Sequence, residues 1–319
     1  MSILNVENLS HGFGDRAIFD NVSFRMLKGE HIGLVGANGE GKSTFMSVVT
    51  GKLMPDEGKI EWAKNVQIGY LDQHSVLQEG ISIRDALKQA FDHLFDMEKR
   101  MNEICDMLTT ADENAMDELM EELGTIQELL MAHDFYTIDA KVEEVANALG
   151  LGDIGLDRDV TELSGGQRTK ILLAKLLLQK PDILLLDEPT TGLDPVERIR
   201  LKNYLSNISK TQIIIISTHI VSDLEHLANK IFIIKSGYII ASGNESELIN
   251  DCEGSVWEVP IHDRDTEYSI KNELVSMIHE DGGVTVARVI NRKKISKEAR
   301  LVKPTLNDAY LYYFNGDQL

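Results

Sequence analysis

Short apolar runs separated by polar turns make up the first 71 residues, and this pattern predicts strands. The runs are residues 3–9, 21–26, 31–36, 59–62 and 66–71. Beyond residue 181 come runs that are aliphatic without interruption, at residues 183–187, 213–217, 231–235 and 238–242. Uninterrupted runs are typical of strands buried on both faces in a parallel sheet covered by helices. Helical stretches at 195–208 and 220–229 follow two of them, so the sequence predicts βα units and an α/β fold.

The middle of the chain has a different period. Leucine, isoleucine and methionine recur every three or four residues from Leu94 to Leu108, and again from Met116 to Leu130. The polar stretch 109–114 separates the two segments. This spacing predicts two amphipathic helices joined by a short turn, which is an antiparallel helical hairpin.

The pattern changes again near residue 251. Residues 255–261 and 283–290 have the pattern of strands, and residues 266–278 and 305–314 have that of helices. We therefore expect a first domain over residues 1–250, with a helical insertion at 82–148. A small α+β extension over 251–319 is expected to follow it.

Composition restricts the class of protein. Hydrophobic residues make up 43% of the 319 and charged residues 26%, which is the balance of a globular protein. No apolar run is long enough to span a bilayer, and the first ten residues lack the features of a signal peptide. Two cysteines, Cys105 and Cys252, make no disulfide framework and have no metal-ligand spacing. We expect a cytoplasmic protein.

The net charge of −20 is unevenly distributed. Between Asp92 and Asp134 there are 13 acidic residues and two basic ones. Direct DNA binding is not expected, because affinity for nucleic acids depends on clustered Lys and Arg. The acidic faces of the predicted hairpin are most simply a solvated surface, and a contact with a basic partner is the alternative. Residues 287–300 are the only basic stretch that suits RNA, and a solvated surface is again the simpler interpretation.

One glycine-rich motif indicates phosphate binding. The residues Gly36, Ala37, Asn38, Gly39, Glu40, Gly41, Lys42, Ser43 and Thr44 fit the pattern G-x-x-x-x-G-K-[ST]. They follow a predicted strand and begin a helix, so backbone N–H groups and the positive end of the helix dipole would face the phosphates. Lys42 would reach the β- and γ-phosphates, and the Ser43 hydroxyl would ligate Mg²⁺. A glycine-rich turn that binds nothing is the alternative, and the flanking strand and helix disfavour it.

An acidic pair completes this chemistry. Asp187 ends the apolar run 183–187, and Glu188 follows it directly. We expect Asp187 to face the metal and Glu188 to act as general base toward the attacking water. Two acids at a strand end are by themselves usually structural, and the phosphate-binding loop is what favours the catalytic interpretation.

A second loop suits an anion. Leu163, Ser164, Gly165, Gly166 and Gln167 precede a helical stretch, so serine and glycines would form another anion-binding helix terminus. One nucleotide does not need two such termini from the same subunit. The loop resembles the signature sequence of ABC-type ATPases, whose serine and glycine close over the γ-phosphate of ATP held by a second, opposed domain.

Further positions resemble the ABC family in the same order. Phe13 is similar to the aromatic residue that stacks on adenine, and Gln73 to the glutamine that joins Mg²⁺ and senses the γ-phosphate. Asp194, in TTGLDP, resembles the acid that connects the two sites of the dimer, and His219 the switch histidine that contacts the γ-phosphate. The resemblance covers residues 1–245 and implies a P-loop ABC ATPase domain. That fold is a mostly parallel sheet with flanking helices and an antiparallel β subdomain.

Two branches of the family are represented. Residues 1–190 resemble the ABC-F branch, soluble ATPases that act on the ribosome, and the predicted hairpin is similar to the ABC-F arm. Residues 191–319 resemble a single-cassette exporter ATPase subunit, because TTGLDP stands where ABC-F proteins have TNxLD. ABC-F proteins carry two cassettes and a basic linker, whereas this sequence has one phosphate loop and one signature. A recombinant or chimeric origin near residue 190 is one explanation.

The resemblance implies an Mg²⁺-dependent ATPase that works as a head-to-tail homodimer. Glu188 and His219 would be catalytic, and Ser43, Gln73 and Asp187 would hold Mg²⁺. The nucleotide would contact Phe13, residues 36–44, Gln73, residues 164–167 and Asp194. We favour an exporter ATPase that serves a separate membrane permease and through it lies at the inner face of the cell membrane. A ribosome-associated translation factor is the alternative, and a regulatory ATP-binding module without either role is a third reading.

Overall fold

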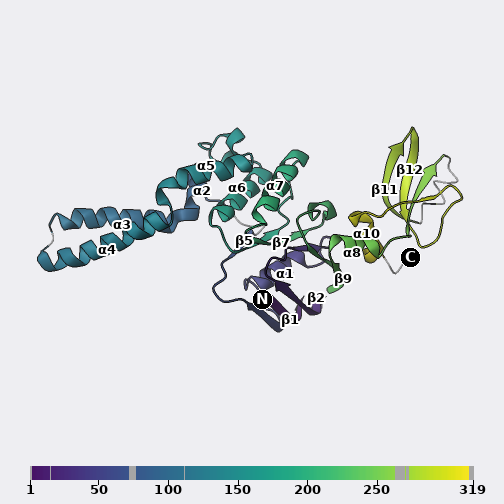
Figure 1. Cartoon of the computed structure of the whole chain (residues 1–319), viewed down its shortest axis with the longest axis horizontal. Helices are drawn as coiled ribbons and strands as arrows, with labels where there is room; N and C mark the ends of the chain where they lie inside the picture. The colour runs from purple at the N-terminus through teal and green to yellow at the C-terminus, as the bar shows by residue number, and fades with distance from the viewer. Residues whose placement is uncertain are drawn as a thin grey trace. The chain divides into compact units, whose positions relative to one another are not determined.

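The computed structural model describes residues 2–14, 16–71, 77–110, 112–262, 270 and 273–315 (Figure 1). Contacts divide the chain into two compact units. The first unit is Met1–Tyr70, Asp182–Thr190 and Leu205–Leu319, and the second is Leu71–Pro181 and Thr191–Tyr204. Whether a functional boundary falls at residue 250 stays a prediction.

A six-stranded sheet forms the centre of the first unit, in the order β5-β6-β7-β3-β8-β9. The strands are β3 (Ile32–Val35), β5 (Ile68–Leu71), β6 (Ile183–Asp187), β7 (Ile213–Thr218), β8 (Lys230–Lys235) and β9 (Tyr238–Gly243). Strands β6, β7, β3 and β8 are parallel, and β9 is antiparallel to β8. Every residue of β3, β6 and β7 is buried, as their uninterrupted apolar runs predict. The parallel pairing places the carboxyl ends of these three strands at one edge of the sheet.

An antiparallel sheet packs with the central one in the same unit. Its strands are β1 (Ser2–Phe13), β2 (Arg16–Leu27) and β4 (Glu57–Trp62), in the order β2-β1-β4. Helix α1 (Lys42–Val49) buries Phe45 and Met46 in a core that also contains residues of both sheets, among them Phe19 and Leu185. The shared core fixes the position of α1, and therefore of the loop before it. The predicted α/β fold is confirmed.

Helices make up the second unit. They are α2 (Ile83–Lys88), α3 (Asp92–Leu108), α4 (Glu113–Ala132), α5 (Ile138–Ala148), α6 (Gly165–Leu178) and the first part of α7 (Pro195–Ile208). Helices α3 and α4 lie side by side as the predicted hairpin (Figure 1). Leu94, Ile104 and Leu130 are buried, and the Arg100 guanidinium binds both carboxylate oxygens of Glu122 at 2.8 Å. The 3.6-residue spacing therefore predicted the contact face of each helix, except at Met116, which is exposed.

The prediction of a helix over residues 220–229 is wrong. The segment contains one 3₁₀ turn, Val221–Asp223, and His226 has a φ of 64°. The Asp223 carboxylate accepts a hydrogen bond from the Thr190 hydroxyl at 2.5 Å, so it is held by a residue distant in sequence. A regular helix over these residues would break the hydrogen bond to Thr190, and it is incompatible with the left-handed backbone conformation of His226.

The remaining elements of the first unit lie after β9. Helix α8 (Glu245–Asn250) precedes a four-stranded sheet in the order β11-β12-β10-β13, and helix α10 (Leu306–Phe314) follows the sheet. The strands are β10 (Val256–Ile261), β11 (Leu274–Asp281), β12 (Val284–Ile290) and β13 (Arg300–Leu301). Val259, Ala287 and Val289 form its buried core. The α+β content expected for this segment is present.

The prediction of a helix over residues 266–278 is wrong for residues 274–278, which belong to β11 and pair antiparallel with β12. Ile270 is helical, as predicted, while residues 266–269, 271 and 272 lie outside the described residues. The two strands meet at Gly282 and Gly283, whose φ values are 59° and 83°. Two consecutive residues with positive φ give the turn that a tight β-hairpin requires.

Among the described residues, no helix combines the length and hydropathy that crossing a membrane requires.

Candidate active site

The glycine-rich loop connects β3 to α1 in the first unit. Gly39 and Gly41 have φ values of 86° and 91°, which favour glycine. A Cβ atom on Gly36 would lie 2.7 Å from the carbonyl oxygen of Ile234, and one on Gly41 would lie 2.4 Å from a methyl carbon of Ile18. Only glycine fits at Gly36 and Gly41, so the loop can keep its backbone close to a ligand.

Two side-chain hydrogen bonds fix this loop to neighbouring segments. The Arg16 guanidinium donates to the carbonyl oxygen of Gly39 at 3.1 Å. The Glu40 carboxylate accepts the N–H of Ser236 at 2.5 Å, so this side chain anchors the loop to the β8–β9 turn. Glu40 was predicted as a nucleotide contact, and the structure gives its carboxylate a different partner. Both hydrogen bonds join the loop to residues distant in sequence, Arg16 in β2 and Ser236 in the β8–β9 turn, which is why local motif analysis missed them.

Lys42 lies at the centre of the site. Its side chain is 4% exposed, and its ammonium donates to the carbonyl oxygens of Gly36 at 3.0 Å and Ala37 at 3.2 Å. The same ammonium is 3.2 Å from a carboxylate oxygen of Glu188. Ser43, in the first turn of α1, is exposed. A buried cation and an exposed hydroxyl therefore stand together at a helix N-terminus.

Glu188 and His219 form a hydrogen-bonded pair. The second carboxylate oxygen of Glu188 lies 2.5 Å from Nδ1 of His219. Because a carboxylate accepts, Nδ1 donates, and Nε2 is left for another partner. Glu188 has a φ of 48°, an uncommon backbone conformation for a residue with a side chain. Such strain costs about 1–3 kcal/mol and is found mainly at functional sites.

Ser217 positions both acids, and sequence analysis did not find it. The Ser217 hydroxyl donates to the Asp187 carboxylate. The backbone N–H of Glu188 donates to the Ser217 carbonyl oxygen at 3.1 Å, and its nitrogen is 3.2 Å from the Ser217 hydroxyl oxygen. Ser217 is fully buried, and Asp187 is 3% exposed. The parallel pairing of β6 with β7 sets Asp187 opposite Ser217. A serine at the end of an isoleucine run carries no signal of this role in the sequence alone.

Phe13 lies at the end of β1 in the same unit. Its ring is 56% exposed and meets the ring of His11 edge to face, with 5.0 Å between centroids. His11 is 7% exposed, and its Nδ1 is 3.4 Å from a carboxylate oxygen of Asp56. An exposed aromatic ring that a buried ring supports has a free face for stacking.

The signature loop belongs to the second unit. Ser164 caps α6: its hydroxyl accepts the N–H of Gln167 at 3.3 Å, and its own N–H donates to the Gln167 side chain at 3.0 Å. Within the described part of the chain the Ser164 hydroxyl donates no hydrogen bond, so its hydrogen is available to a ligand. Gln167 completes the cap, so the structure gives its side chain a structural role.

Asp194 is tied to the same loop. Its carboxylate accepts the N–H of Glu197 at 2.8 Å and so caps α7. The buried ammonium of Lys170, on α6, pairs with the Glu197 carboxylate. Gly166 and Gly192 are in close contact, because a Cβ atom on Gly166 would lie 2.5 Å from the Gly192 carbonyl oxygen. The signature loop and the Asp194 loop therefore form one rigid surface.

This contact gives a test with a matched control. Gly166→Ala must displace the Gly192 loop, whereas a Cβ atom on Gly165 meets nothing within 4 Å. We expect Gly166→Ala to lower the free energy of unfolding by about 1–3 kcal/mol, the usual cost of overpacking. Gly165→Ala is expected to leave it within about 0.5 kcal/mol. Denaturant unfolding measures both, and equal stabilities would contradict the contact.

The structure thus brings some predicted residues together. Lys42, Asp187, Glu188 and His219 gather at the carboxyl ends of β3, β6 and β7 in the first unit. The signature residues and Asp194 belong to the second unit. Gln73 lies outside the described residues.

These residues fit a nucleotide with Mg²⁺. The glycine cradle, the buried Lys42 and the N–H groups of α1 suit a polyphosphate. No group of three or more His, Cys, Asp or Glu side chains gathers as a metal site in the described part of the chain. That result is compatible with Mg²⁺, which binds one or two protein ligands and otherwise phosphate and water oxygens. Ser43 and Asp187 are the ligands the described residues offer.

Comparisons with known proteins show the family to which the chain belongs. A family model described as "ABC transporter" matches residues 19–191. The chain is 52% identical over 304 residues to "Uncharacterized ABC transporter ATP-binding protein YfmM" of Bacillus subtilis, which covers 95% of this chain and 58% of that protein. It is 32% identical over 260 residues to "Energy-dependent translational throttle protein EttA" of Escherichia coli, and the alignment covers 81% of this chain and 46% of that protein. The chain thus spans about half the length of the curated relatives it matches.

A solved structure titled "Structure of ATP binding subunit of ABC transporter" has a TM-score of 0.56 at 22% identity, covering 78% of this chain and 92% of that one. At this identity the likeness concerns the fold alone. A 304-residue alignment in a chain of 319 has to pass through residue 190. One relative therefore matches both parts of the chain, and two origins are not needed to explain its sequence.

Proposed function

Because this chain belongs to the ABC transporter family of ATP-hydrolysing proteins, we propose that it hydrolyses Mg²⁺-bound ATP at a site shared by two cassettes. The observation that supports this most is the chain of contacts from Lys42 through Glu188 to His219. A buried cation at a phosphate loop adjoins a general base, and a histidine orients that base. Each of the three groups has a place in phosphoryl transfer to water.

When ATP binds, the Lys42 ammonium leaves the Glu188 carboxylate and contacts the β- and γ-phosphates instead. The exchange is required because Lys42 has a single ammonium for the carboxylate and the phosphates. Glu188 is thereby released to accept a proton from the attacking water. His219 donates through Nδ1 to Glu188 and keeps Nε2 for the γ-phosphate. Bound Mg²⁺, held by Asp187, Ser43 and Gln73, would supply charge neutralisation at the phosphate oxygens.

A second copy of the cassette would complete the site. Ser164 has a hydroxyl hydrogen to donate, and the first N–H groups of α6 lie beside it. We propose that these donors close over the γ-phosphate held by the opposed copy. The phosphate loop and the signature loop belong to different compact units, which suits a signature that serves the other copy's nucleotide.

We propose translation as the process that ATP drives. The relative named as a translational throttle matches 260 of 319 residues, and such a stretch has to include residues 60–260 and therefore α3 and α4. The hairpin is acidic, with exposed carboxylates such as those of Glu121 and Glu128. Acidic faces repel RNA phosphates, so a basic protein surface of the ribosome is the contact that their charge suits.

The exporter role predicted from the sequence stays as a second candidate. It is supported by TTGLDP at residues 190–195, by the α+β segment after β9, and by the printed description of YfmM as an ABC transporter ATP-binding protein. It requires a membrane permease as partner.

One experiment separates the two candidates. We expect the Glu188→Gln chain in ATP to sediment with purified ribosomes and not to float with membranes. Neutralising the hairpin, by Glu121→Gln with Glu128→Gln, should weaken ribosome binding roughly 2- to 30-fold, because an exposed ion pair contributes about 0.2–1 kcal/mol. The control Glu253→Gln with Glu280→Gln removes two exposed acids elsewhere and should change nothing. Flotation with membranes, and no binding to ribosomes, would favour the exporter.

A further inference from the structure

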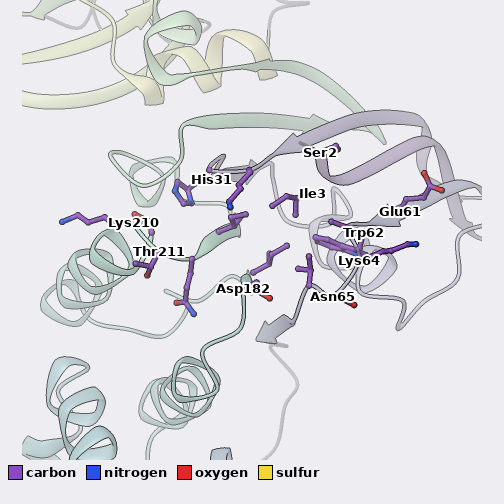
Figure 2. Close-up of a pocket in the computed structure, with 18 residues that line it drawn as sticks. Ser2, Ile3, His31, Glu61, Trp62, Lys64, Asn65, Asp182, Lys210 and Thr211 are labelled. Atoms are coloured by element: carbon purple, nitrogen blue, oxygen red, sulfur yellow. The ribbon is translucent and has the colours of Figure 1, made fainter. Parts of the chain in front are cut away.

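The first unit contains a cavity of about 1010 Å³ that none of the residues assigned to ATP lines. Its walls include His31, Trp62, Asp182 and Lys210 (Figure 2). This volume is at the upper end of the range for small-molecule sites, about 300–1,000 Å³. The cavity therefore has room for a small organic ligand.

The cavity lies at the opposite end of the catalytic strands. His31 directly precedes β3, Ile183 is the first residue of β6, and Ile213 is the first residue of β7. The phosphate loop, Glu188 and His219 follow the last residues of the same three strands. A strand of five residues separates its ends by about 13 Å. A ligand here would be distinct from ATP in the candidate active site.

Unpaired cations mark this cavity. Lys28, Lys64 and Lys210 line it and are exposed, and in the described part of the chain their ammonium groups have no ion-pair partner. Its two acids are already engaged: Glu61 pairs with Lys59, and Asp182 accepts the N–H of Gln67 at 2.9 Å.

The surplus of free positive charge is local, because the whole chain carries −20. Free ammonium groups around a concave surface attract anions.

The rest of the lining is apolar. Ile3, Trp62 and Val66 are half-buried against the main core, and Ile183 and Ile213 close the wall. The indole N–H of Trp62 donates to the Val49 carbonyl oxygen at 2.8 Å, which fixes the ring. A fixed aromatic ring beside aliphatic side chains suits a flat ligand body. Figure 2 shows Trp62 and Lys64 together on one side of the space and Lys210 and Thr211 on the other.

From the charges and the apolar wall, we propose that this cavity binds a nucleoside monophosphate. Its base lies against Trp62, and its phosphate, with up to two negative charges, is attracted by the lysines that lie on opposite sides of the cavity. Val49 is the last residue of α1, and Lys42 is the first, so Trp62 connects the cavity to the helix that begins at the phosphate loop.

The two tryptophans make a direct test available, because Trp257→Phe leaves Trp62 as the only one. Adding Lys42→Ala weakens nucleotide binding at the phosphate loop, so a change in Trp62 fluorescence reports on the cavity and does not depend on the proposed ATPase function. Titration with AMP and GMP is expected to change Trp62 fluorescence in a saturable way. Lys64→Gln with Lys210→Gln should weaken binding about 10-fold or more, since a charge-assisted contact with either lysine contributes about 1.5–3 kcal/mol.

The control pair is Lys293→Gln with Lys294→Gln, two exposed lysines outside the cavity, and it should leave binding unchanged. Absence of a saturable change with either nucleotide up to about 10 mM would overturn the proposal, as binding would then contribute less than about 3 kcal/mol. Equal weakening by the control pair would overturn it too. Inorganic phosphate binding as tightly as the nucleotides would exclude the stacking on Trp62.

Discussion

Glu188→Gln is expected to slow ATP hydrolysis by roughly 10²–10⁴-fold, or about 3–5 kcal/mol of barrier. The amide keeps the size of the side chain but cannot accept the proton of the attacking water. It also replaces the acceptor that orients His219, since the 2.5 Å contact joins a carboxylate oxygen to Nδ1. Phosphate release under single-turnover conditions measures the chemical step directly.

Binding should survive this change, because Lys42 gains freedom when Glu188 loses its charge. We therefore expect the variant to accumulate as an ATP-bound dimer, which light scattering with and without ATP detects. Glu253→Gln, an exposed acid far along the chain, serves as the control and should match the unmodified rate. A Glu188→Gln chain that stays monomeric in saturating ATP would contradict the dimer mechanism.

Sequence patterns predicted correctly the strands, helices and loop whose conformation is determined by residues close together in sequence. The uninterrupted aliphatic runs at 183–187 and 213–217 are fully buried parallel strands, and the heptad-like spacing of α3 and α4 produced a hairpin. The glycine motif could be recognised because its backbone conformation needs glycine at fixed positions, as at Gly41. In each case the residues that determine the structure are neighbours in sequence.

The two wrong helix predictions and the missed serine have a common cause, which is contacts between residues distant in sequence. Residues 220–229 looked helical, but Asp223 is held by Thr190. Residues 274–278 carried apolar side chains at helical spacing, yet the turn at Gly282 pairs them with β12 as a strand. Ser217 was missed because its role exists only when β7 lies beside β6.

Lys42→Ala is expected to weaken ATP binding by roughly 30- to 150-fold or more, because a charged hydrogen bond contributes about 2–3 kcal/mol and Lys42 serves two phosphates. The substitution also leaves the Glu188 carboxylate, 11% exposed, without the cation 3.2 Å away. A fluorescent ATP analogue titrated against the purified chain measures the loss. Unchanged affinity would contradict the phosphate-loop assignment.

The same variant tests whether two copies share each site. Ser164 is exposed, so Ser164→Arg blocks the signature without disturbing a core. Neither variant alone should hydrolyse ATP, but a mixed dimer joins the intact phosphate loop of one chain to the intact signature of the other. Equal mixing makes about half of the dimers mixed, each with one working site of two, so about a quarter of the activity should return. A mixture as inactive as its parents would mean that each copy builds its site alone, because only a shared site allows the two defects to be separated.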